Sequence, residues 1–433
     1  IAVGGGARVE LLYFITRLVQ PRTILETGVA HGYSSYTFLS AMARNGTDGR
    51  LYSSDFPYFR LEDPERYVGC IVPEALRAGW HLYLRGDRAN LAEILPQCGP
   101  ISLFHYDSDK SVEGRTFGMA AVRMAKSIGV NDGGGSIRIP AGFTGLPGLK
   151  ATYGRIPKGP NMVMASLTAV SGCLSRSVRD IARFFDVSNG FDPRDPYSLP
   201  RVDGWEAGLG THLDALRGAR VAFAPTWGSA VVSPAMWDLL QAVGLELVDH
   251  LSMRRVDDVD LTLPRMGTVW SLSGNLGVEA KLADHWPACA DLLTPEIRFG
   301  MEAAAGRYDS AARAKIERRR AELNDAMARI FDAADGVDFV ITATNPDVAF
   351  DADGPLPSVF GGVEAGASNN GRLTFAANLH GNPAISIPAG AVDGLPVGLQ
   401  VVGRHFSEPL LLDLALTVER LRPWPLVAPG SPA

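Results

Sequence analysis

A run of glycines followed by serine is the stretch of this sequence best suited to covalent chemistry. It lies in Asp132-Gly-Gly-Gly-Ser136-Ile-Arg-Ile-Pro140. A serine that attacks a carbonyl group needs a base for its proton and N–H donors for the oxyanion that develops. Glycines just before the serine leave successive N–H groups unshielded, so these groups can point into one concavity. For Gly-Gly-Gly-Ser alone, a glycine-rich loop with a solvent-facing serine is the competing interpretation.

A second glycine-containing turn, Glu26-Thr-Gly28-Val-Ala-His-Gly32, could hold a small ligand. It follows an apolar run and opens a helical pattern, and its glycines would let the backbone approach a ligand closely. Asp55 ends the next apolar run, where a carboxylate can accept hydrogen bonds from ribose hydroxyls, and Asp87 follows the third run. The turn therefore suits a nucleotide-like ligand, and an ordinary tight turn is the alternative.

The first part of the chain alternates strand-like and helix-like segments. The predicted strands are 23–29, 50–56, 81–87 and 101–107, and the predicted helices are 33–44, 64–78, 88–95 and 113–127. This alternation predicts a parallel sheet that is covered on both faces. Ligands of such sheets bind at the carboxyl ends of the strands, where the polar residues of this part collect.

The pattern changes after residue 130, where glycine and proline become dense and long amphipathic helices are predicted at 174–188 and 296–334. The second predicted helix carries the basic run RAKIERRRAEL (313–323). We interpret this run as a solvated helix face rather than as a nucleic-acid contact. The apolar positions expected on its opposite face are Ile316, Leu323, Met327, Ile330 and Phe331.

Composition and charge limit the classes of protein to which this chain can belong. A chain of 433 residues, 46% hydrophobic and 20% charged, can form two or three domains or one large α/β enzyme. The net charge of -6 argues against a nucleic-acid binder, and no apolar run is long enough to span a membrane. The four cysteines lie far apart and form no CxxC pair or metal spacing, so we expect a cytoplasmic protein without a metal.

The longer string around the first glycine run, GGGSIRIPAGFTGLPGLKATYGRIP (133–157), resembles the nucleophile segment of the amidase signature family. The resemblance continues through SLTAVSGCLSRSVRDIARFFDV (166–187) and through residues 373–419. It implies that residues 131–433 form an amidase-signature domain, a mixed sheet covered by helices, without the family's N-terminal third. By this resemblance Ser136 is the nucleophile, and it attacks a small-molecule carboxylic amide. The N–H groups that would form the oxyanion hole are those of Gly133, Gly134, Gly135 and Ser136.

The same resemblance implies a serine–serine–lysine proton relay in place of a histidine base. By this resemblance the relay serine would stand at Val112. Ser111 is adjacent, but the residues around it do not have the family's Gly-Ser context. The family's lysine would lie further upstream, and residues 1–109 contain no lysine. His105 and His380 do not replace it by their spacing, and we interpret both as structural. We therefore expect an amidase whose rate is impaired because its base and its relay are absent.

The first part of the chain resembles the class I S-adenosylmethionine-dependent methyltransferases, mainly in ILETGVAHGYSS (24–35) and ISLFHYDSDKSVEGR (101–115). This resemblance implies S-adenosylmethionine as a cofactor. It stops near Gly129, before the family's remaining strands, so residues 1–128 are expected to form a truncated, Rossmann-like methyltransferase domain. The ligand residues that it implies are Glu26, Gly28 and Gly32 for the methionine end, Asp55 for the ribose and Asp87 for the adenine.

Three interpretations stay open for the whole chain. It is an amidase-type hydrolase, an S-adenosylmethionine-dependent O-methyltransferase-like protein, or a fusion of two parts without catalysis. The two patterns meet near residues 127–132 without a polar linker, which favours a joined sequence over an evolved bifunctional enzyme. The substrate pocket of the amidase part is expected at 189–215 and 265–300, and a homodimer is left open.

Overall fold

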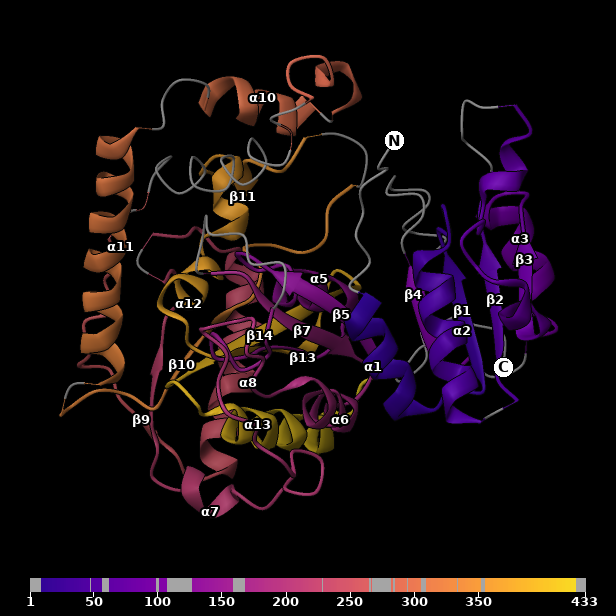
Figure 1. Cartoon of the computed structure of the whole chain (residues 1–433). Helices are drawn as coiled ribbons and strands as arrows, with labels where there is room; N and C mark the ends of the chain where they lie inside the picture. The colour runs from indigo at the N-terminus through magenta and orange to yellow at the C-terminus, as the bar shows by residue number, and fades with distance from the viewer. Residues whose placement is uncertain are drawn as a thin grey trace. The chain divides into compact units, whose positions relative to one another are not determined.

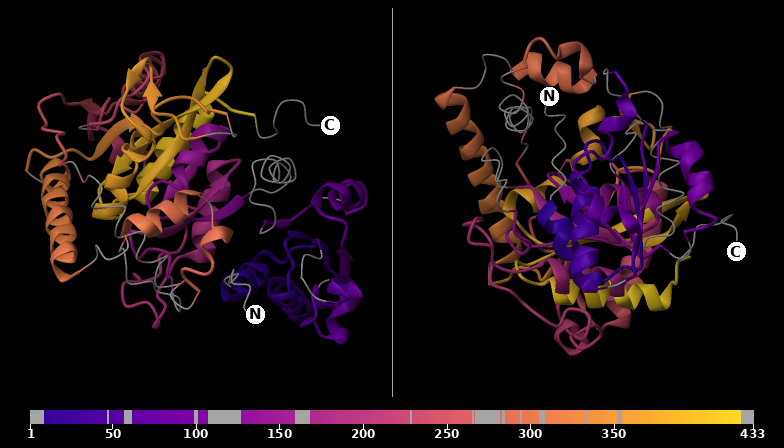
Figure 2. Two further views of the ribbon diagram at one scale, coloured as in Figure 1. Left: turned by 90° about the horizontal axis from the view of Figure 1, so that it is seen from above. Right: turned by 45° about the vertical axis from the view of Figure 1, so that its right-hand side comes forward.

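The computed structural model divides the chain into two compact units, unit 1 with residues 1–128 and 427–433, and unit 2 with residues 129–426. In Figures 1 and 2 unit 1 is the indigo and violet part, and unit 2 runs from magenta to yellow. The residues that the structure describes are 9–46, 48–56, 62–98, 101–106, 127–158, 168–227, 229–264, 266, 282, 285–293, 295–304, 309–332, 334–351 and 355–425.

Unit 1 is built on a four-stranded parallel sheet, as the sequence predicts. The sheet has the order β3-β2-β1-β4, so the direction in which strands are added reverses between β1 and β4. In parallel sheets, ligands bind beyond the carboxyl ends of the strands at such a reversal. The strands are β1 (Thr23–Thr27), β2 (Arg50–Ser54), β3 (Trp80–Tyr83) and β4 (Leu103–Tyr106).

Helices cover both faces of this sheet. Two of the predicted helices are confirmed as α2 (Tyr33–Asn45), which packs on the face that carries Ile24, and α3 (Asp87–Ile94), which packs on the face that carries Leu25. Ile24 and Leu25 are neighbours in β1, so their side chains point to opposite faces. Both are fully buried, and each contributes about 1.5–3 kcal/mol to the hydrophobic core. A further helix, α1 (Val9–Val19), packs along α2.

The helix predicted at 64–78 is wrong. The chain forms two short 3-10 segments there, η1 (Pro64–Tyr67) and η2 (Glu74–Gly79). Between them Gly69 has a positive φ of 69°, and a proline that lacks an N–H donor precedes η2. A continuous helix cannot pass through this stretch. The helix predicted at 113–127 lies outside the described residues, apart from its last residue, which belongs to a strand.

Unit 2 is built on an eight-stranded mixed sheet of order β5-β7-β6-β13-β14-β10-β8-β9, in agreement with the predicted fold class. Among the pairs whose register is described, β10–β8 and β8–β9 are parallel and the others are antiparallel. A separate hairpin pairs β11 (Val359–Phe360) with β12 (Val363–Glu364). The strands of the main sheet are β5 (Ser127–Asp132), β6 (Gly148–Lys150), β7 (Val170–Ser175), β8 (Arg220–Phe223), β9 (Arg254–Arg255), β10 (Phe339–Ala343), β13 (Ala384–Val392) and β14 (Leu395–Gly403).

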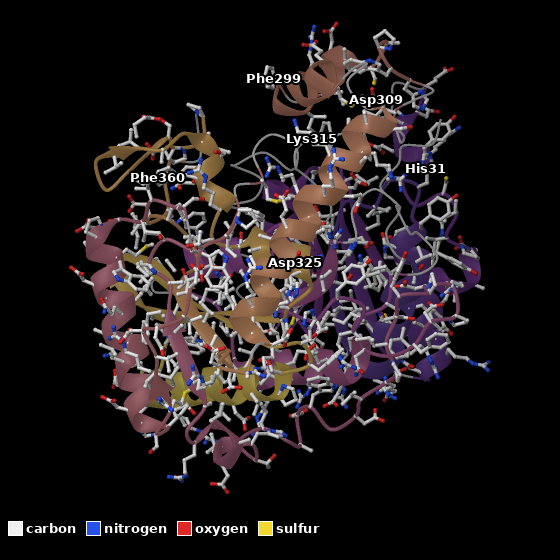
Figure 3. All side chains as sticks on the ribbon, turned by 90° about the vertical axis from the view of Figure 1, so that its left-hand side faces the viewer. His31, Phe299, Asp309, Lys315, Asp325 and Phe360 are labelled. Atoms are coloured by element: carbon white, nitrogen blue, oxygen red, sulfur yellow. The ribbon has the colours of Figure 1, made fainter. Side chains whose placement is uncertain are left out.

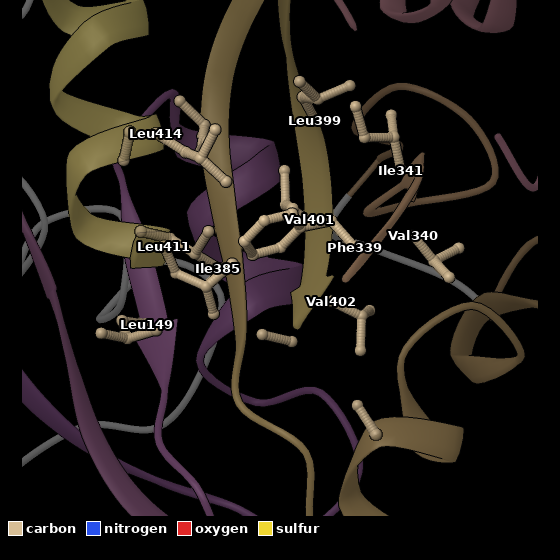
Figure 4. Close-up of a cluster of buried hydrophobic side chains, with 14 of the residues drawn as sticks. Leu149, Phe339, Val340, Ile341, Ile385, Leu399, Val401, Val402, Leu411 and Leu414 are labelled. Atoms are coloured by element: carbon tan, nitrogen blue, oxygen red, sulfur yellow. The ribbon is translucent and has the colours of Figure 1, made fainter. Parts of the chain in front are cut away.

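One face of this sheet is apolar and carries the main core. Residues that are paired across neighbouring strands share a face, so Ile341, Val401 and Ile385 lie on the same side. The helices α8 (Pro234–His250) and α13 (Glu408–Leu421) pack on this side, and Figure 4 shows leucines of α13 beside Ile385. The helix α13 therefore completes the core of unit 2.

The opposite face carries a polar row. Thr342, Gln400 and Ser386 are paired across β10, β14 and β13, and all three are fully buried. The short helices α5 (Arg138–Thr144) and α12 (Phe375–His380) lie on this side of the sheet. Buried polar groups need hydrogen-bond partners, so this face is suited to hold polar groups of the helices above it.

The helix predicted at 174–188 begins later than expected. Its first residues belong to β7, and α6 (Val178–Ser188) follows after a short turn. Ser177 caps the helix, because its Oγ accepts the N–H of Asp180 at 3.2 Å. An N-cap side chain satisfies an N–H group that has no partner within the helix, so it fixes where the helix starts.

The single helix predicted at 296–334 is also wrong. It is replaced by α10 (Pro295–Ala304) and α11 (Ser310–Phe331). Asp309 starts the second helix, since its extended backbone cannot continue a helix and its carboxylate accepts the N–H of Ala312 at 2.7 Å. The apolar positions predicted on α11 are confirmed as buried, namely Ile316, Leu323, Met327, Ile330 and Phe331.

The basic run of α11 is largely exposed, in agreement with a solvated face. Arg313, Lys315, Arg318 and Arg319 are exposed, and Figure 3 labels Lys315 on this helix. Arg320 differs, because it is half-buried and donates to the Leu379 carbonyl at 2.9 Å. Within the described parts of the chain, no helix combines the length and the apolar character that a membrane crossing requires.

Candidate active site

The turn that carries Ser136 joins β5 to α5. Ser136 is exposed, while Asp132 at the end of β5 and Arg138 at the start of α5 are fully buried. Gly135 has a φ of 142°, which L side chains rarely adopt, and a Cβ added there would lie 2.6 Å from Ile139 Cδ1 and closer still to a neighbouring hydroxyl. The turn therefore requires glycine directly before the serine.

The carboxylate of Asp132 organises this turn from the inside. Its Oδ1 accepts the N–H of Gly134 at 3.0 Å and the N–H of Gly135, and its Oδ2 accepts the N–H of Ile137 at 3.2 Å. The Arg138 guanidinium lies 3.5 Å from Oδ2. Burial alone would raise the pKa of Asp132, but the Arg138 cation and the N–H donors outweigh it, and the pKa lies below its ordinary value. The carboxylate is therefore ionised and acts as the centre of the turn.

Two N–H groups of the turn point away from this carboxylate. Within the described residues, the N–H groups of Gly133 and Ser136 have no hydrogen-bond partner. The carbonyl of Asp132 accepts from Asn378 Nδ2 at 3.1 Å, and the carbonyl of Gly135 accepts from the second N–H of α5 at 2.8 Å. In a trans peptide the C=O and the following N–H point in opposite directions. The Gly133 N–H therefore points away from Asn378, and the Ser136 N–H points away from α5.

Arg138 ties the turn to the polar face of the sheet. Its Nη1 donates to Gln400 Oε1 at 2.7 Å, and its Nη2 donates to Asn378 Oδ1. Asn378 in turn donates to Asp132 Oδ1 at 3.0 Å. A buried ion pair stabilises a fold only where further hydrogen bonds satisfy its remaining polar atoms. Gln400 and Asn378 supply these bonds, so the Asp132–Arg138 pair and its partners act as one network.

Among the described residues, no side chain is hydrogen-bonded to the hydroxyl of Ser136 as a base would be. Lys150 on β6 is fully buried and donates from Nζ to the Ala151 carbonyl at 2.8 Å. Burial and the nearby Arg138 cation lower the pKa of Lys150 to about 7. The other candidates near in sequence lie outside the described residues, namely Lys110, Ser111 and Lys126.

The two histidines that we interpret as structural, His105 and His380, have contacts of their own. His380 Nδ1 lies 2.5 Å from Asn382 Oδ1, and burial lowers the pKa of His380. The ring of His105 in unit 1 packs edge-on against Phe38, with the ring centroids 5.5 Å apart. Among the described residues of unit 2, His380 forms no hydrogen bond with Ser136.

The predicted ligand residues of unit 1 lie near the carboxyl end of its sheet. Gly28 and Gly32 both have positive φ, 81° and 98°, and lie in the turn between β1 and α2. Asp55 follows β2, and its Oδ2 accepts the N–H of Val29 at 2.8 Å and that of Ala30 at 2.6 Å. Asp55 therefore holds the glycine turn itself, a role that the sequence did not indicate.

The other two predicted ligand residues also make contacts inside unit 1. Glu26 is fully buried, and its Oε2 accepts the hydroxyls of Ser35 at 2.5 Å and Ser53 at 2.7 Å. Its Oε1 lies 3.8 Å from His105 Nδ1. Asp87 Oδ1 accepts a serine hydroxyl of β2 at 2.7 Å. These carboxylates connect strands and helices of unit 1, and their part in ligand binding stays a prediction.

Of the segments expected to shape the substrate pocket, 189–215 is described and much of 265–300 is not. Trp205 is buried, and its ring packs against Phe185 with the centroids 5.3 Å apart. It belongs to the core of unit 2. Trp270 lies outside the described residues.

Sequence reasoning missed three residues that support the turn, namely Thr374, Asn378 and Gln400. Thr374 Oγ1 donates to the Gly134 carbonyl at 2.7 Å, across a sequence separation of 240 residues. No local pattern links such distant positions. The signal in the sequence is limited to the place of these three polar residues, each of which stands in an otherwise apolar segment.

Unit 2 is thus an α/β domain in which a serine-bearing glycine turn is held by a buried carboxylate. A family model named Amidase matches residues 119–412, a span that contains the whole turn, and the chain belongs to the amidase family.

The chain is similar to the A subunits of glutamyl-tRNA(Gln) amidotransferases. It is 30% identical to the A subunit of this name from Methylococcus capsulatus, with 72% of this chain and 67% of the relative covered. It is 34% identical to the corresponding protein from Synechococcus sp. (strain WH7803), with 78% of this chain and 72% of the relative covered. The chain therefore spans about two thirds of the length of these relatives.

Solved structures of similar fold include a bacterial aryl acylamidase of the amidase signature enzymes family. It is 25% identical, with a TM-score of 0.61, 71% of this chain and 65% of that chain covered. A structure of a vestigial protein complex related to the origins of an s-triazine catabolic enzyme has a TM-score of 0.62 at 19% identity, covering 95% of this chain and 94% of that chain. The second likeness concerns the fold alone.

Proposed function

We propose that this chain hydrolyses carboxylic amides with Ser136 as the nucleophile. The observation that carries the proposal is the pairing of an exposed serine hydroxyl with two open N–H groups on the same turn. A carbonyl carbon bound at the hydroxyl would place its oxygen within reach of such donors, which is the arrangement that acyl transfer requires. Membership of the amidase family supports an amide as the substrate class.

The oxyanion hole of this proposal uses fewer donors than the sequence suggests. Of the four predicted N–H groups, those of Gly134 and Gly135 donate to the Asp132 carboxylate. The N–H groups of Gly133 and Ser136 are the remaining donors for a developing oxyanion. Loss of one such donor typically lowers the rate by about 10²–10³-fold, so the orientation of this pair matters for the reaction.

We further propose that turnover is slow. A serine hydroxyl without a positioned proton acceptor stays protonated near neutral pH, and removing a member of a catalytic unit costs about 10³–10⁶-fold in rate. Among the described residues, Lys150 does not fill this role because it donates to a backbone carbonyl in the core. By this proposal the amidase part, residues 131–433, carries a serine nucleophile but does not carry the family's relay.

The test is release of ammonia from small primary amides by the full chain. Slow release that disappears in Ser136→Ala supports the proposal. Ser310→Ala, at another exposed serine on α11, is the matched control and should retain the wild-type rate. Equal release by wild-type protein and Ser136→Ala would overturn the proposal.

A second candidate function concerns unit 1, which we propose as a truncated methyltransferase-like domain that binds S-adenosylmethionine. The reversal of strand order between β1 and β4, with the Gly28–Gly32 turn beside it, supports this candidate. Calorimetry with S-adenosylmethionine tests it. Asp87→Asn is the preferred variant, because Asp55→Ala would also remove the carboxylate that accepts the N–H groups of Val29 and Ala30 and so holds the turn. The absence of binding at millimolar ligand would rule this candidate out.

A further inference from the structure

We propose that Asn378, and Thr374 at the start of α12, are positioning residues that hold the nucleophile turn in the form that presents its oxyanion donors. This inference rests on the proposed function, since the donors matter only if Ser136 attacks a carbonyl. Both residues donate to backbone carbonyls of the turn, so each acts through the backbone of the turn rather than on the substrate.

The contacts of α12 with the turn are direct and buried. Asn378 Nδ2 donates to the carbonyl of Asp132 at 3.1 Å and to its Oδ1 at 3.0 Å, and it also donates to the Thr168 carbonyl at 3.1 Å. Thr374 Oγ1 donates to the Gly134 carbonyl at 2.7 Å. Thr374 and Asn378 are fully buried, and a spacing of four residues places them on one side of the helix. One short element therefore holds two separate peptides of the turn.

Each of these bonds fixes the plane of one peptide. The peptide between Asp132 and Gly133 has its carbonyl on Asn378, so its N–H, the open donor of Gly133, faces the opposite direction. The peptide between Gly134 and Gly135 has its carbonyl on Thr374, so its N–H faces the Asp132 carboxylate, to which it donates. Asn378 thus aims the Gly133 N–H away from α12, and Thr374 keeps the Gly134–Gly135 peptide turned towards the Asp132 carboxylate.

The position of α12 is itself held by the same network. Arg138 donates to Asn378 Oδ1, so the amide group of Asn378 cannot rotate without breaking bonds at both of its ends. Gln400 accepts from Arg138 at 2.7 Å and donates to the Leu373 carbonyl just before α12 at 2.8 Å. The sheet, the helix and the turn are therefore linked through side chains that come from different parts of the chain.

The first arm of the test measures the turn itself. Hydrogen exchange of a peptide that spans residues 131–137 is followed by mass spectrometry in the full chain. Asn378→Ala should speed exchange of the N–H groups of Gly134, Gly135 and Ile137, because the carboxylate that they bind loses a donor. Asn382→Ala is the matched control, since Asn382 is an equally buried amide that donates to the Gly403 carbonyl at 2.8 Å. Identical exchange in Asn378→Ala and wild type would overturn the proposal.

The second arm measures the chemistry and uses a milder pair of variants. The rate at which a fluorophosphonate probe labels Ser136 should fall by about 10-fold or more in Thr374→Val while the probe concentration at half-maximal rate changes by less than about twofold. Thr374→Ser keeps the hydroxyl and should restore the labelling rate. Labelling of Thr374→Val at the wild-type rate would refute the positioning role. If wild-type Ser136 is not labelled at all, the proposed function fails, and the exchange arm still decides whether α12 holds the turn.

Discussion

Glycine at position 135 offers the sharpest test of the geometry of the turn. Its φ of 142° lies where L side chains are strained, and a Cβ there would lie 2.6 Å from Ile139 Cδ1. Such backbone strain costs about 1–3 kcal/mol, and overpacking costs a further 1–3 kcal/mol or so. We therefore expect Gly135→Ala to lower the free energy of unfolding of unit 2 by about 2–6 kcal/mol. This is a large part of the 5–15 kcal/mol or so that ordinary domains have.

The first glycine of the same turn supplies a matched control. Gly133 does not have a positive φ, and a Cβ added there would meet nothing within 4 Å. Gly133→Ala should therefore change the free energy of unfolding by no more than about 0.5 kcal/mol. The two variants differ by the same methyl group, two residues apart on the same turn.

Urea unfolding followed by tryptophan fluorescence measures both effects. The core of unit 2 contains Trp205 and Trp227, so its unfolding changes the emission. The midpoint for Gly135→Ala should move to clearly lower urea, while that for Gly133→Ala should coincide with wild type. Coincident midpoints for the two variants would refute the assigned backbone of the turn.

Three further predictions concern the network around the turn and the limits of its elements. Arg138→Met should cost about 3–5 kcal/mol in urea unfolding because it leaves the buried Asp132 carboxylate unpaired, whereas Arg319→Ala, at an exposed ion pair, should cost less than about 1 kcal/mol. The pKa of Lys150 in the folded chain is lowered to about 7, so above that pH the unfolded chain binds more protons than the folded chain. The free energy of unfolding should therefore rise by up to about 1.4 kcal/mol per pH unit towards pH ~10. A Lys150→Met variant whose free energy of unfolding rises as steeply would contradict this. Ser177→Ala should lower the melting temperature through the loss of about 1 kcal/mol of capping, and an unchanged melting curve would argue against the cap.

The features that the sequence predicts well are those written in local patterns. Apolar runs in β1 and β2 mark buried strands, and the alternation with helices indicates the parallel sheet of unit 1. The glycines before Ser136 mark a turn, because the backbone at Gly135 needs a conformation that other residues avoid. The helix limits that were missed had readable signals, since Ser177 and Asp309 are ordinary N-cap residues.

The features that the sequence could not predict depend on long-range contacts. Asn378 and Gln400 reach Arg138 across separations of 240 and 262 residues, and nothing near them in the sequence points to that partner. The sequence indicated that Gly133, Gly134, Gly135 and Ser136 could present N–H groups to a substrate. It did not indicate which of them the Asp132 carboxylate would occupy, because that depends on the path of the folded turn.

The central claim is that Ser136 is a nucleophile on a turn with two open N–H donors. Peptide mapping after treatment of the full chain with a fluorophosphonate probe tests it most directly. The account predicts a covalent adduct on Ser136, formed slowly and absent from Ser136→Ala. A chain that stays unlabelled at Ser136, or whose adduct maps to another serine and persists in Ser136→Ala, would contradict it.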